Sequence, residues 1–227
     1  MESVSVLKEN QLEDFINGAV RALEGIAREK VFVDNFLQSI NDKNIENLQG
    51  VYYRQCRKVL EERLSGNDNF NELFVLDGEG KVYLSTNQAH EGRNESSMPY
   101  FIKAQQGTFI QSFYYSLMLK QLTTVIASPV KNDGGQTAGI LAARINLAKI
   151  SNTMIERSGL GETGETYLVN KFNYMVSESR FEGGLALKGT VYNDAVKDCL
   201  KGNSGHKTYN NYRDISTIGV YRWLPKT

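Results

Sequence analysis

The stretch from Met98 to Leu147 constrains the fold of this chain most, because its turn signals divide it into one helix and three strands. Pro99 suits the first turn of a short helix, and Gly107 suits the position just after its end. Two strands are predicted next, over TFIQSFYYS and KQLTTVIASPV. The polar turn from Lys131 to Gly135 tolerates positive φ and folds the chain back into a third strand. This order predicts an antiparallel sheet with a helix beside it.

The third strand alternates in character from Ile140 to Leu147, which predicts two different faces. One face is apolar and consists of Leu141, Ala143, Ile145 and Leu147. The opposite face consists of Ile140, Ala142, Arg144 and Asn146. Because this second face carries a single charge, Arg144, we expect it to be the functional face, with the rest of the chain as its scaffold.

The first third of the chain predicts helices. Apolar residues recur every three or four positions from about Val6 to Ser39, with a stripe from Leu12 to Phe36. A second helix is predicted from about Ile45 to Leu64, with Asn44 as a candidate cap. Two interpretations of the first helix remain open. It packs along a partner or leads out of a membrane, or it is a plain core helix.

The second half of the chain repeats the first. The segment from Thr166 to Ser177 corresponds to an earlier hairpin whose turn is Asp77 to Gly80. Three matched pairs are Phe74 with Tyr167, Gly107 with Gly202 and Pro129 with Pro225, at offsets of 93, 95 and 96 residues. In the first copy a further turn and strand follow the proline, whereas the second copy stops at Thr227. We therefore expect the second copy to lack its last strand in this chain.

Several function classes find no support in the sequence. The 26 basic and 26 acidic residues balance, whereas a nucleic-acid binder usually carries a basic surplus. Cys56 and Cys199 lack the spacing of a zinc site or a disulfide framework, so we expect two small buried residues. His90 and His206 lie in polar segments, where we expect solvated side chains. We predict no metal and no cofactor.

The glycine-rich segment from Gly159 to Glu165 does not match a phosphate-binding motif, which needs a lysine or a complete G-x-G-x-x-G. A hinge or linker is the better interpretation, with Glu162 and Glu165 as solvated turn residues. No catalytic constellation of nucleophile, histidine and acid is evident, so we predict no enzyme. No apolar run approaches the roughly 20 residues that cross a bilayer.

The order of these segments resembles the double-Cache sensor domains, which are extracytoplasmic input modules of transmembrane histidine kinases, chemoreceptors and diguanylate cyclases. The resemblance covers essentially the whole chain and rests on the long N-terminal helix and on the segments FVLDGEGKVYLST, MPYFIKAQQG, SFYYS, TTVIASPV, AGILAARINL, GLGETGETYLVN and IGVYRWLP. It implies an α+β fold of two tandem PAS-like units, each an antiparallel sheet with helices, stacked on the N-terminal helix. The implied domains are a helical spine over 1–66, a membrane-distal ligand-binding unit over 67–158 and a truncated membrane-proximal unit over 159–227.

The resemblance also implies binding residues. In double-Cache domains that bind amino acids, the pocket arginine corresponds to Met98, an aromatic pair to Tyr100 and Phe101, and a pocket tyrosine to Tyr115. The aspartate that holds the ligand ammonium corresponds to Arg144. The aromatic walls therefore remain, while both charged positions differ. A guanidinium favours a carboxylate over an ammonium, so we expect a small anionic or uncharged ligand without a free amino group, a carboxylate among the candidates.

The predicted function is that of an extracytoplasmic ligand-sensing domain of a transmembrane receptor in the cell membrane. The expected partners are the small molecule and a second copy of the chain, paired along the N-terminal helix from Leu12 to Phe36. An alternative is a ligand-free structural or dimerisation module. In that case Arg144 pairs with an acid, Tyr100 and Phe101 pack helix against sheet, and Met98 fills space.

Overall fold

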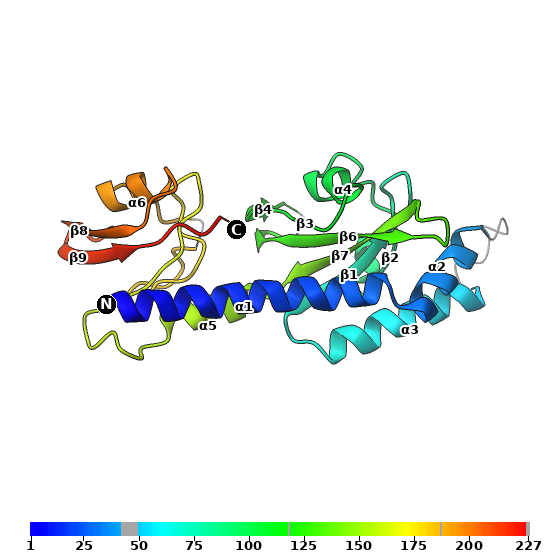
Figure 1. Cartoon of the computed structure of the whole chain (residues 1–227), viewed down its shortest axis with the longest axis horizontal. Helices are drawn as coiled ribbons and strands as arrows, with labels where there is room; N and C mark the ends of the chain where they lie inside the picture. The colour runs from blue at the N-terminus through cyan, green and yellow to red at the C-terminus, as the bar shows by residue number, and fades with distance from the viewer. Residues whose placement is uncertain (42–49, 118, 187, 226–227) are drawn as a thin grey trace. The chain divides into compact units, whose positions relative to one another are not determined.

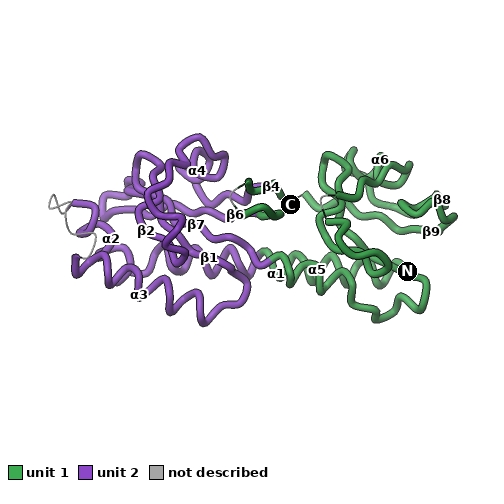
Figure 2. Tube along the Cα trace, turned by 180° about the vertical axis from the view of Figure 1, so that it is seen from behind, with its two compact units in different colours: residues 1–16, 113–123, 147–227 green, residues 17–112, 124–146 purple. Residues whose placement is uncertain are grey.

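The computed structural model describes residues 1–41, 50–117, 119–186 and 188–225 of the chain. The chain divides into two compact units. Unit 1 comprises residues 1–16, 113–123 and 147–227, and unit 2 comprises residues 17–112 and 124–146 (Figure 2). Helix α1, Glu2–Ala27, supplies residues to both units. The domain boundaries expected after residues 66 and 158 stay a prediction.

Unit 2 is built on a five-stranded antiparallel sheet in the order β2-β1-β7-β6-β3. Its strands are β1 Phe70–Leu76, β2 Val82–Ser85, β3 Phe109–Ile110, β6 Val125–Lys131 and β7 Thr137–Ile145. Its helices, besides the end of α1, are α2 Lys30–Asn41, α3 Val51–Ser65, η1 Gln88–His90 and α4 Pro99–Ala104. The α+β class that the sequence predicted is confirmed.

The two hairpins of unit 2 form where the sequence places them. Between β1 and β2, the Asp77 carboxylate accepts hydrogen bonds from the backbone N–H groups of Glu79 and Lys81, at 3.0 and 2.9 Å. Gly80 has φ +82°, and an added Cβ atom would lie 2.5 Å from the Cα atom of Ser96. Glycine is therefore required there by backbone conformation and by space.

Both faces of β7 are covered, which differs from the expected contrast between two faces. Ile140, Leu141, Ala142 and Ala143 are all fully buried, and Arg144 is 4% exposed. In Figure 1, α4 lies on one side of the sheet, with α2 and α3 on the other. Because a central strand with covered faces gains by being apolar throughout, alternation along β7 is weak.

The N-terminal helix is broken, contrary to the prediction of one helix from Val6 to Ser39. Helix α1 ends at Ala27 and α2 begins at Lys30. Leu23 and Phe32 are both fully buried, yet nine residues separate them, which is about two and a half turns at 3.6 residues per turn. In a straight helix they would point in opposite directions, and the break lets the two side chains be buried on one side of the helical segment.

The apolar stripe on these helices packs inside its own chain. Its buried members include Leu12, Ile16, Ala19, Leu23, Phe32 and Phe36. The stripe therefore serves the core and does not form the exposed seam expected for pairing with a second copy. Helix α3 begins at Val51. The predicted cap Asn44 and the predicted helix start at Ile45 lie outside the described residues.

The two strands expected after α4 are each divided. The chain from Thr108 to Ser116 forms β3 and then β4, Tyr114–Ser116, while the return segment forms β5, Gln121–Thr123, and then β6. Strands β4 and β5 pair with each other in a separate two-stranded sheet assigned to unit 1. At the break, the Thr124 carbonyl accepts a hydrogen bond from the N–H of Ile145 in β7, at 3.1 Å. Thr124 thus bonds to β7, whereas Thr123 pairs with β4.

Unit 1 repeats part of this pattern. Its further elements are α5 Leu147–Ile155, α6 Asp194–Cys199, β8 Gly205–Asn210 and β9 Ser216–Tyr221. Helix α6 has six residues, as α4 has, and begins 95 residues after it. Strands β8 and β9 pair antiparallel. The expected hairpin from Thr166 to Ser177 is reduced to isolated bridges, such as Val169 with Met175.

Three smaller expectations can be compared with the structure. Glu165 is not a solvated turn residue, because its carboxylate accepts hydrogen bonds from the hydroxyls of Tyr212 and Ser179. Cys56 is buried, Cys199 is half-buried, and both are free thiols. His206 is exposed as expected, in strand β8.

Candidate functional site

The candidate site in unit 2 is centred on a buried ion pair between two neighbouring strands. Glu72 in β1 and Arg144 in β7 are register partners in the antiparallel sheet. The Arg144 Nε–H donates to Oε2 of Glu72 at 2.6 Å, and each residue is 4% exposed. Cross-strand partners lie about 5 Å apart at Cβ, so the strand register brings these two charges together.

A fully buried histidine joins this pair. His90 ends the short helix η1, and its Nδ1 atom lies 2.6 Å from Oε1 of Glu72. Its Nε2 atom lies 3.0 Å from Oε1 of Glu95 and 3.3 Å from Nη2 of Arg144. The Ser85 hydroxyl donates to Oε1 of Glu72 at 2.6 Å. His90 therefore links two carboxylates and a guanidinium, and the expectation that it is solvated is wrong.

The network reaches helix α4 through Glu95 and Tyr100. The Tyr100 hydroxyl donates to Oε2 of Glu95 in a short hydrogen bond. The ring of Phe74 packs beside three of these side chains, with its centroid 6.0 Å from that of Tyr100, 4.6 Å from that of His90 and 5.3 Å from the guanidinium carbon of Arg144. We call Glu72, Ser85, His90, Glu95, Tyr100 and Arg144 the buried cluster.

The charges of the cluster shift one another's pKa values. Burial alone would lower the pKa of His90, but hydrogen bonds and charges from Glu72 and Glu95 outweigh it and raise this pKa above 6.5. For Glu72, burial would raise the pKa, but the hydrogen bond and charge of His90, with Ser85 and Arg144, lower it below 4.5. Each group thus stabilises the charged form of the other.

The structure brings two of the five predicted site residues into the cluster, Tyr100 and Arg144. Met98 is half-buried at the start of α4, where its carbonyl accepts a hydrogen bond from the Phe101 N–H at 3.0 Å. Phe101 is buried in α4. Tyr115 lies in β4 of unit 1 and is 52% exposed. The binding role of all five residues stays a prediction.

Sequence reasoning missed Glu72, His90, Glu95 and Phe74. A signal existed for Glu72, because it interrupts the apolar positions Phe70, Phe74 and Leu76 on one face of a strand. An acid at such a position needs a buried cation. His90 and Glu95 lie in a polar loop, and no local pattern distinguishes them from solvated residues.

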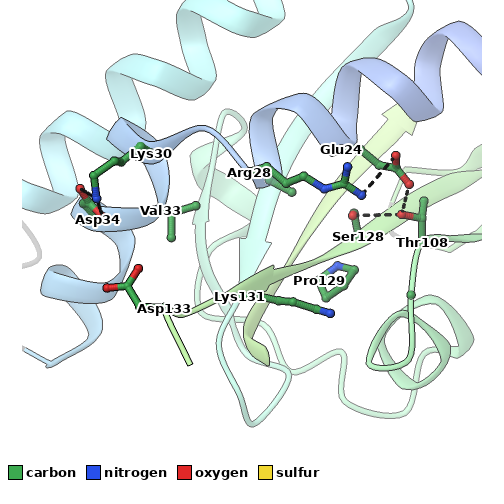
Figure 3. A pocket seen from close by; sticks show the side chains of 12 residues that line it. Glu24, Arg28, Lys30, Val33, Asp34, Thr108, Ser128, Pro129, Lys131 and Asp133 are labelled. Carbon is green, nitrogen blue, oxygen red and sulfur yellow. Dashed lines mark hydrogen bonds and ion pairs between the residues drawn. The ribbon is translucent and has the colours of Figure 1, made fainter. Parts of the chain in front are cut away.

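Unit 2 also contains a pocket of about 480 Å³, which none of the five predicted residues lines (Figure 3). Its charged lining consists of Glu24, Arg28, Lys30, Asp34, Lys131 and Asp133. Lys30 pairs with Asp34 at 2.9 Å, and the Thr108 hydroxyl donates to Glu24 at 2.6 Å. Because three cations face three acids, the charge of this pocket favours no particular class of ligand.

The described residues contain neither a candidate metal site nor a candidate membrane span. Among them, no group of three or more His, Cys, Asp and Glu side chains is placed to hold a metal ion. None of the helices described combines the length and the apolar character that a membrane span needs.

Several solved structures share this fold. The ligand-binding domain of the Pseudomonas aeruginosa PAO1 amino-acid chemoreceptor PctC, in complex with GABA, is 15% identical, with a TM-score of 0.66 over 96% of this chain and 88% of that chain. The corresponding domain of the Campylobacter jejuni chemoreceptor Tlp3, in complex with 4-methylisoleucine, is also 15% identical, with a TM-score of 0.64 over 91% and 79%. That of the Pseudomonas fluorescens chemoreceptor CtaA, in complex with L-serine, is 18% identical, with a TM-score of 0.56 over 80% and 71%.

The sequence comparisons give one match at the level of the family. No curated protein matches the chain significantly. A family profile described as a Cache domain, of the dCache_1 type, matches residues 1–227. Because this match spans the whole chain, the protein belongs to the Cache domain family, whose members are sensor domains and not enzymes.

Proposed function

We propose that this chain is the extracytoplasmic sensor domain of a membrane-anchored receptor and that unit 2, as its membrane-distal unit, binds a small uncharged or anionic molecule without a free amino group. The buried cluster is the observation that carries this proposal. It places Tyr100 of α4 and Arg144 of β7 in one network within the fold that chemoreceptor ligand-binding domains share.

The charges of the cluster argue against an ammonium ligand. Both of its carboxylates already accept hydrogen bonds, Glu72 from Arg144 and Ser85, and Glu95 from Tyr100. An incoming ammonium would have to displace one of these donors and would meet the positive charge of Arg144. Displacing a partner from a buried ion pair costs about 3–5 kcal/mol, and this cost would weaken the binding of an ammonium ligand.

Within the proposed class, the geometry favours an uncharged ligand over an anion. Glu72 already holds the Nε–H of Arg144 at 2.6 Å. A carboxylate or phosphate ligand would compete with Glu72 for the same guanidinium, and two anions close together in a buried site repel. An uncharged polar molecule does not compete with Glu72 for this guanidinium, so its binding would leave the pair intact.

A thermal-shift and calorimetry screen on the 227-residue chain tests the proposal. The compounds are matched pairs that differ in the amino group, such as lactate against alanine and 4-hydroxybutyrate against GABA, with the uncharged butyramide as a third arm. A ligand at 100 times its dissociation constant should stabilise the fold by about 2.7 kcal/mol. Binding of the amino compounds in preference to their partners would contradict the proposal.

Two variants test whether the ligand binds at the buried cluster. Tyr100→Phe removes only the hydroxyl that donates to Glu95, so it should weaken binding while the fold persists. Phe172→Leu, at an exposed position in unit 1, serves as the control and should leave binding unchanged. Equal affinities for the wild type and Tyr100→Phe would place the ligand elsewhere.

We propose further that the signal travels along α1, which is one continuous helix with residues in both units. A ligand that prefers one packing of unit 2 would bias the position of this helix by no more than its difference in affinity between the two states. Pairing with a second copy through α1 would use the outer face that carries the exposed Val6 and Leu7, since the stripe from Leu12 to Phe36 is largely buried.

A second candidate is a ligand-free structural or dimerisation module. The observation in its favour is that the charged groups of the cluster pair with one another, so the fold needs no ligand to neutralise them. This candidate predicts no thermal shift with any compound of the screen and concentration-dependent association of the chain.

A further inference from the structure

The Nε2 atom of His90 faces two partners that require opposite protonation states. The Nδ1 atom lies 2.6 Å from the carboxylate of Glu72, which accepts hydrogen bonds, so Nδ1 carries a proton. Nε2 lies 3.3 Å from Nη2 of Arg144, which can only donate, and 3.0 Å from Oε1 of Glu95, which accepts when ionised. A neutral His90 therefore accepts from Arg144, and a protonated His90 donates to Glu95.

The charge balance of the cluster changes with this proton. Glu72 and Glu95 contribute two negative charges and Arg144 one positive charge, so protonated His90 makes the cluster neutral. The side chain of His90 is 0% exposed and that of Glu95 is 16% exposed, so water can screen an imbalance only at the Glu95 end of the cluster. A net charge left in the interior is costly. Proton binding at His90 is thus coupled to the energy of the whole cluster.

The groups that face His90 come from every element around it. They are Glu72 and Phe74 of β1, Arg144 of β7 and Glu95 of the segment before α4, with Ser85 of β2 and Tyr100 of α4 reached through the two carboxylates. Glu91 follows His90 in the chain, but its carboxylate accepts from Arg57, Tyr53 and the Ser85 N–H instead.

We propose that His90 is a buried proton-binding site through which this domain senses pH, with protonation moving the Nε2 contact from Arg144 to Glu95 and, through the Glu95–Tyr100 hydrogen bond, altering helix α4. The ligand of this site is the proton itself. The proposal goes beyond the sensing of a small molecule and does not depend on it.

The surroundings of His90 favour its protonated form. The two carboxylates raise the pKa of His90 above 6.5, its ordinary value, despite burial. The neutral form of His90 therefore predominates only at a pH higher than for an ordinary histidine.

Nuclear magnetic resonance of the imidazole nitrogens tests this assignment. The chain has two histidines, and the exposed His206 in unit 1 can be replaced as His206→Asn to leave one imidazole. We expect one titration between pH 5 and 9 with a midpoint above 6.5, and backbone amide shifts from Glu95 to Ala104 with the same midpoint. An imidazole that keeps one charge state across this range, or α4 amides that do not follow it, would overturn the proposal.

Two variants separate the switch from a structural role. In Glu95→Gln, the loss of a carboxylate 3.0 Å from Nε2 should lower the midpoint by about 1 to 3 pH units. In Tyr100→Phe, the titration should persist while the shifts of the α4 amides weaken. Glu79→Gln, in the exposed turn between β1 and β2, is the control and should leave the midpoint unchanged.

The outcomes also distinguish this proposal from the proposed small-molecule function. If a small molecule binds but His90 does not titrate, the proposed sensor function is supported and the proposed proton site is wrong. If His90 titrates together with the α4 amides but no small molecule binds, the proton site is supported and the proposed small-molecule function is contradicted. An unaltered midpoint in Glu95→Gln would show that Glu95 is not the partner of protonated His90 and would overturn the switch.

Discussion

At the scale of single residues, Glu72 holds the buried cluster together. Its carboxylate accepts hydrogen bonds from Arg144, His90 and Ser85 at 2.6 Å each. Glu72→Gln removes the negative charge that pairs with the Nε–H of the buried Arg144. We expect the free energy of unfolding to fall by about 3–5 kcal/mol, measured by urea denaturation.

A double-mutant cycle checks the cause of this loss. In Glu72→Gln/Arg144→Gln both charges of the pair are gone, so much of the stability lost in the single variant should return. Losses that simply add in the double variant would contradict a direct coupling between these two residues.

The pH dependence of stability also arises at this scale. Because the folded pKa of His90 lies above 6.5, its stabilising contribution is complete below pH 6.5 and is lost as the pH rises through the folded value. The folded pKa of Glu72 lies below 4.5, so its contribution is complete above pH 4.5 and is lost as the pH falls through the folded value. Stability should therefore be highest between pH 4.5 and 6.5.

Urea denaturation at several pH values measures this profile. The variant His90→Asn should lack the decline on the alkaline side, whereas His206→Asn, at an exposed position, should retain it. If the stability of His90→Asn falls equally steeply at alkaline pH, another group causes the decline.

At the scale of elements, the break between α1 and α2 rests on the burial of Phe32. This side chain is fully buried and stacks on Phe36, with ring centroids 6.1 Å apart. Phe32→Ala should lower the free energy of unfolding by about 3–5 kcal/mol, because it leaves a cavity. Val31→Ala, at the preceding position with 57% exposure, should change it by no more than about 0.5 kcal/mol. Similar losses in the two variants, from thermal or urea unfolding, would disprove this packing.

At the scale of the whole molecule, the apolar stripe of α1 belongs to the interior. Ile16 and Leu23 are 5% and 0% exposed within a single chain. Leu23→Ala should therefore lower the free energy of unfolding by about 2–5 kcal/mol. Its sedimentation coefficient should equal that of the wild type at every protein concentration. Val6→Glu, on the exposed face, should instead abolish any association that occurs through α1. Loss of association in a folded Leu23→Ala variant would restore the stripe as an interface.

Most local elements of the fold can be predicted from the sequence. Pro99 and Gly107 bracket α4, and Asp77 with Gly80 forms the turn of the first hairpin, because these residues act on their own backbone and on near neighbours. The offset that relates Gly107 to Gly202 also relates α4 to α6. The split of the strands at Thr124 was not predictable, because it depends on a hydrogen bond with β7.

The candidate site was predictable in part. Tyr100 and Arg144, which the resemblance to a sensor family indicates as site residues, both lie in the buried cluster. The charge of Arg144 was expected to face a ligand, whereas in the fold it faces Glu72, which lies 72 residues earlier in the chain. His90 gave no signal, since a histidine in a polar loop is usually solvated.

The sequence by itself determined most of the local helices, strands and turns, and the spacing that α4 and α6 share, because those properties depend on side chains close together in the chain. Only the tertiary structure decided the partners of the charged groups. The order β2-β1-β7-β6-β3 sets β1 beside β7 and so pairs Glu72 with Arg144, and the closing of the η1 segment over the sheet buries His90 between them. Such contacts join segments far apart in the chain. They form because a charge is stable in the interior only beside a group that neutralises it.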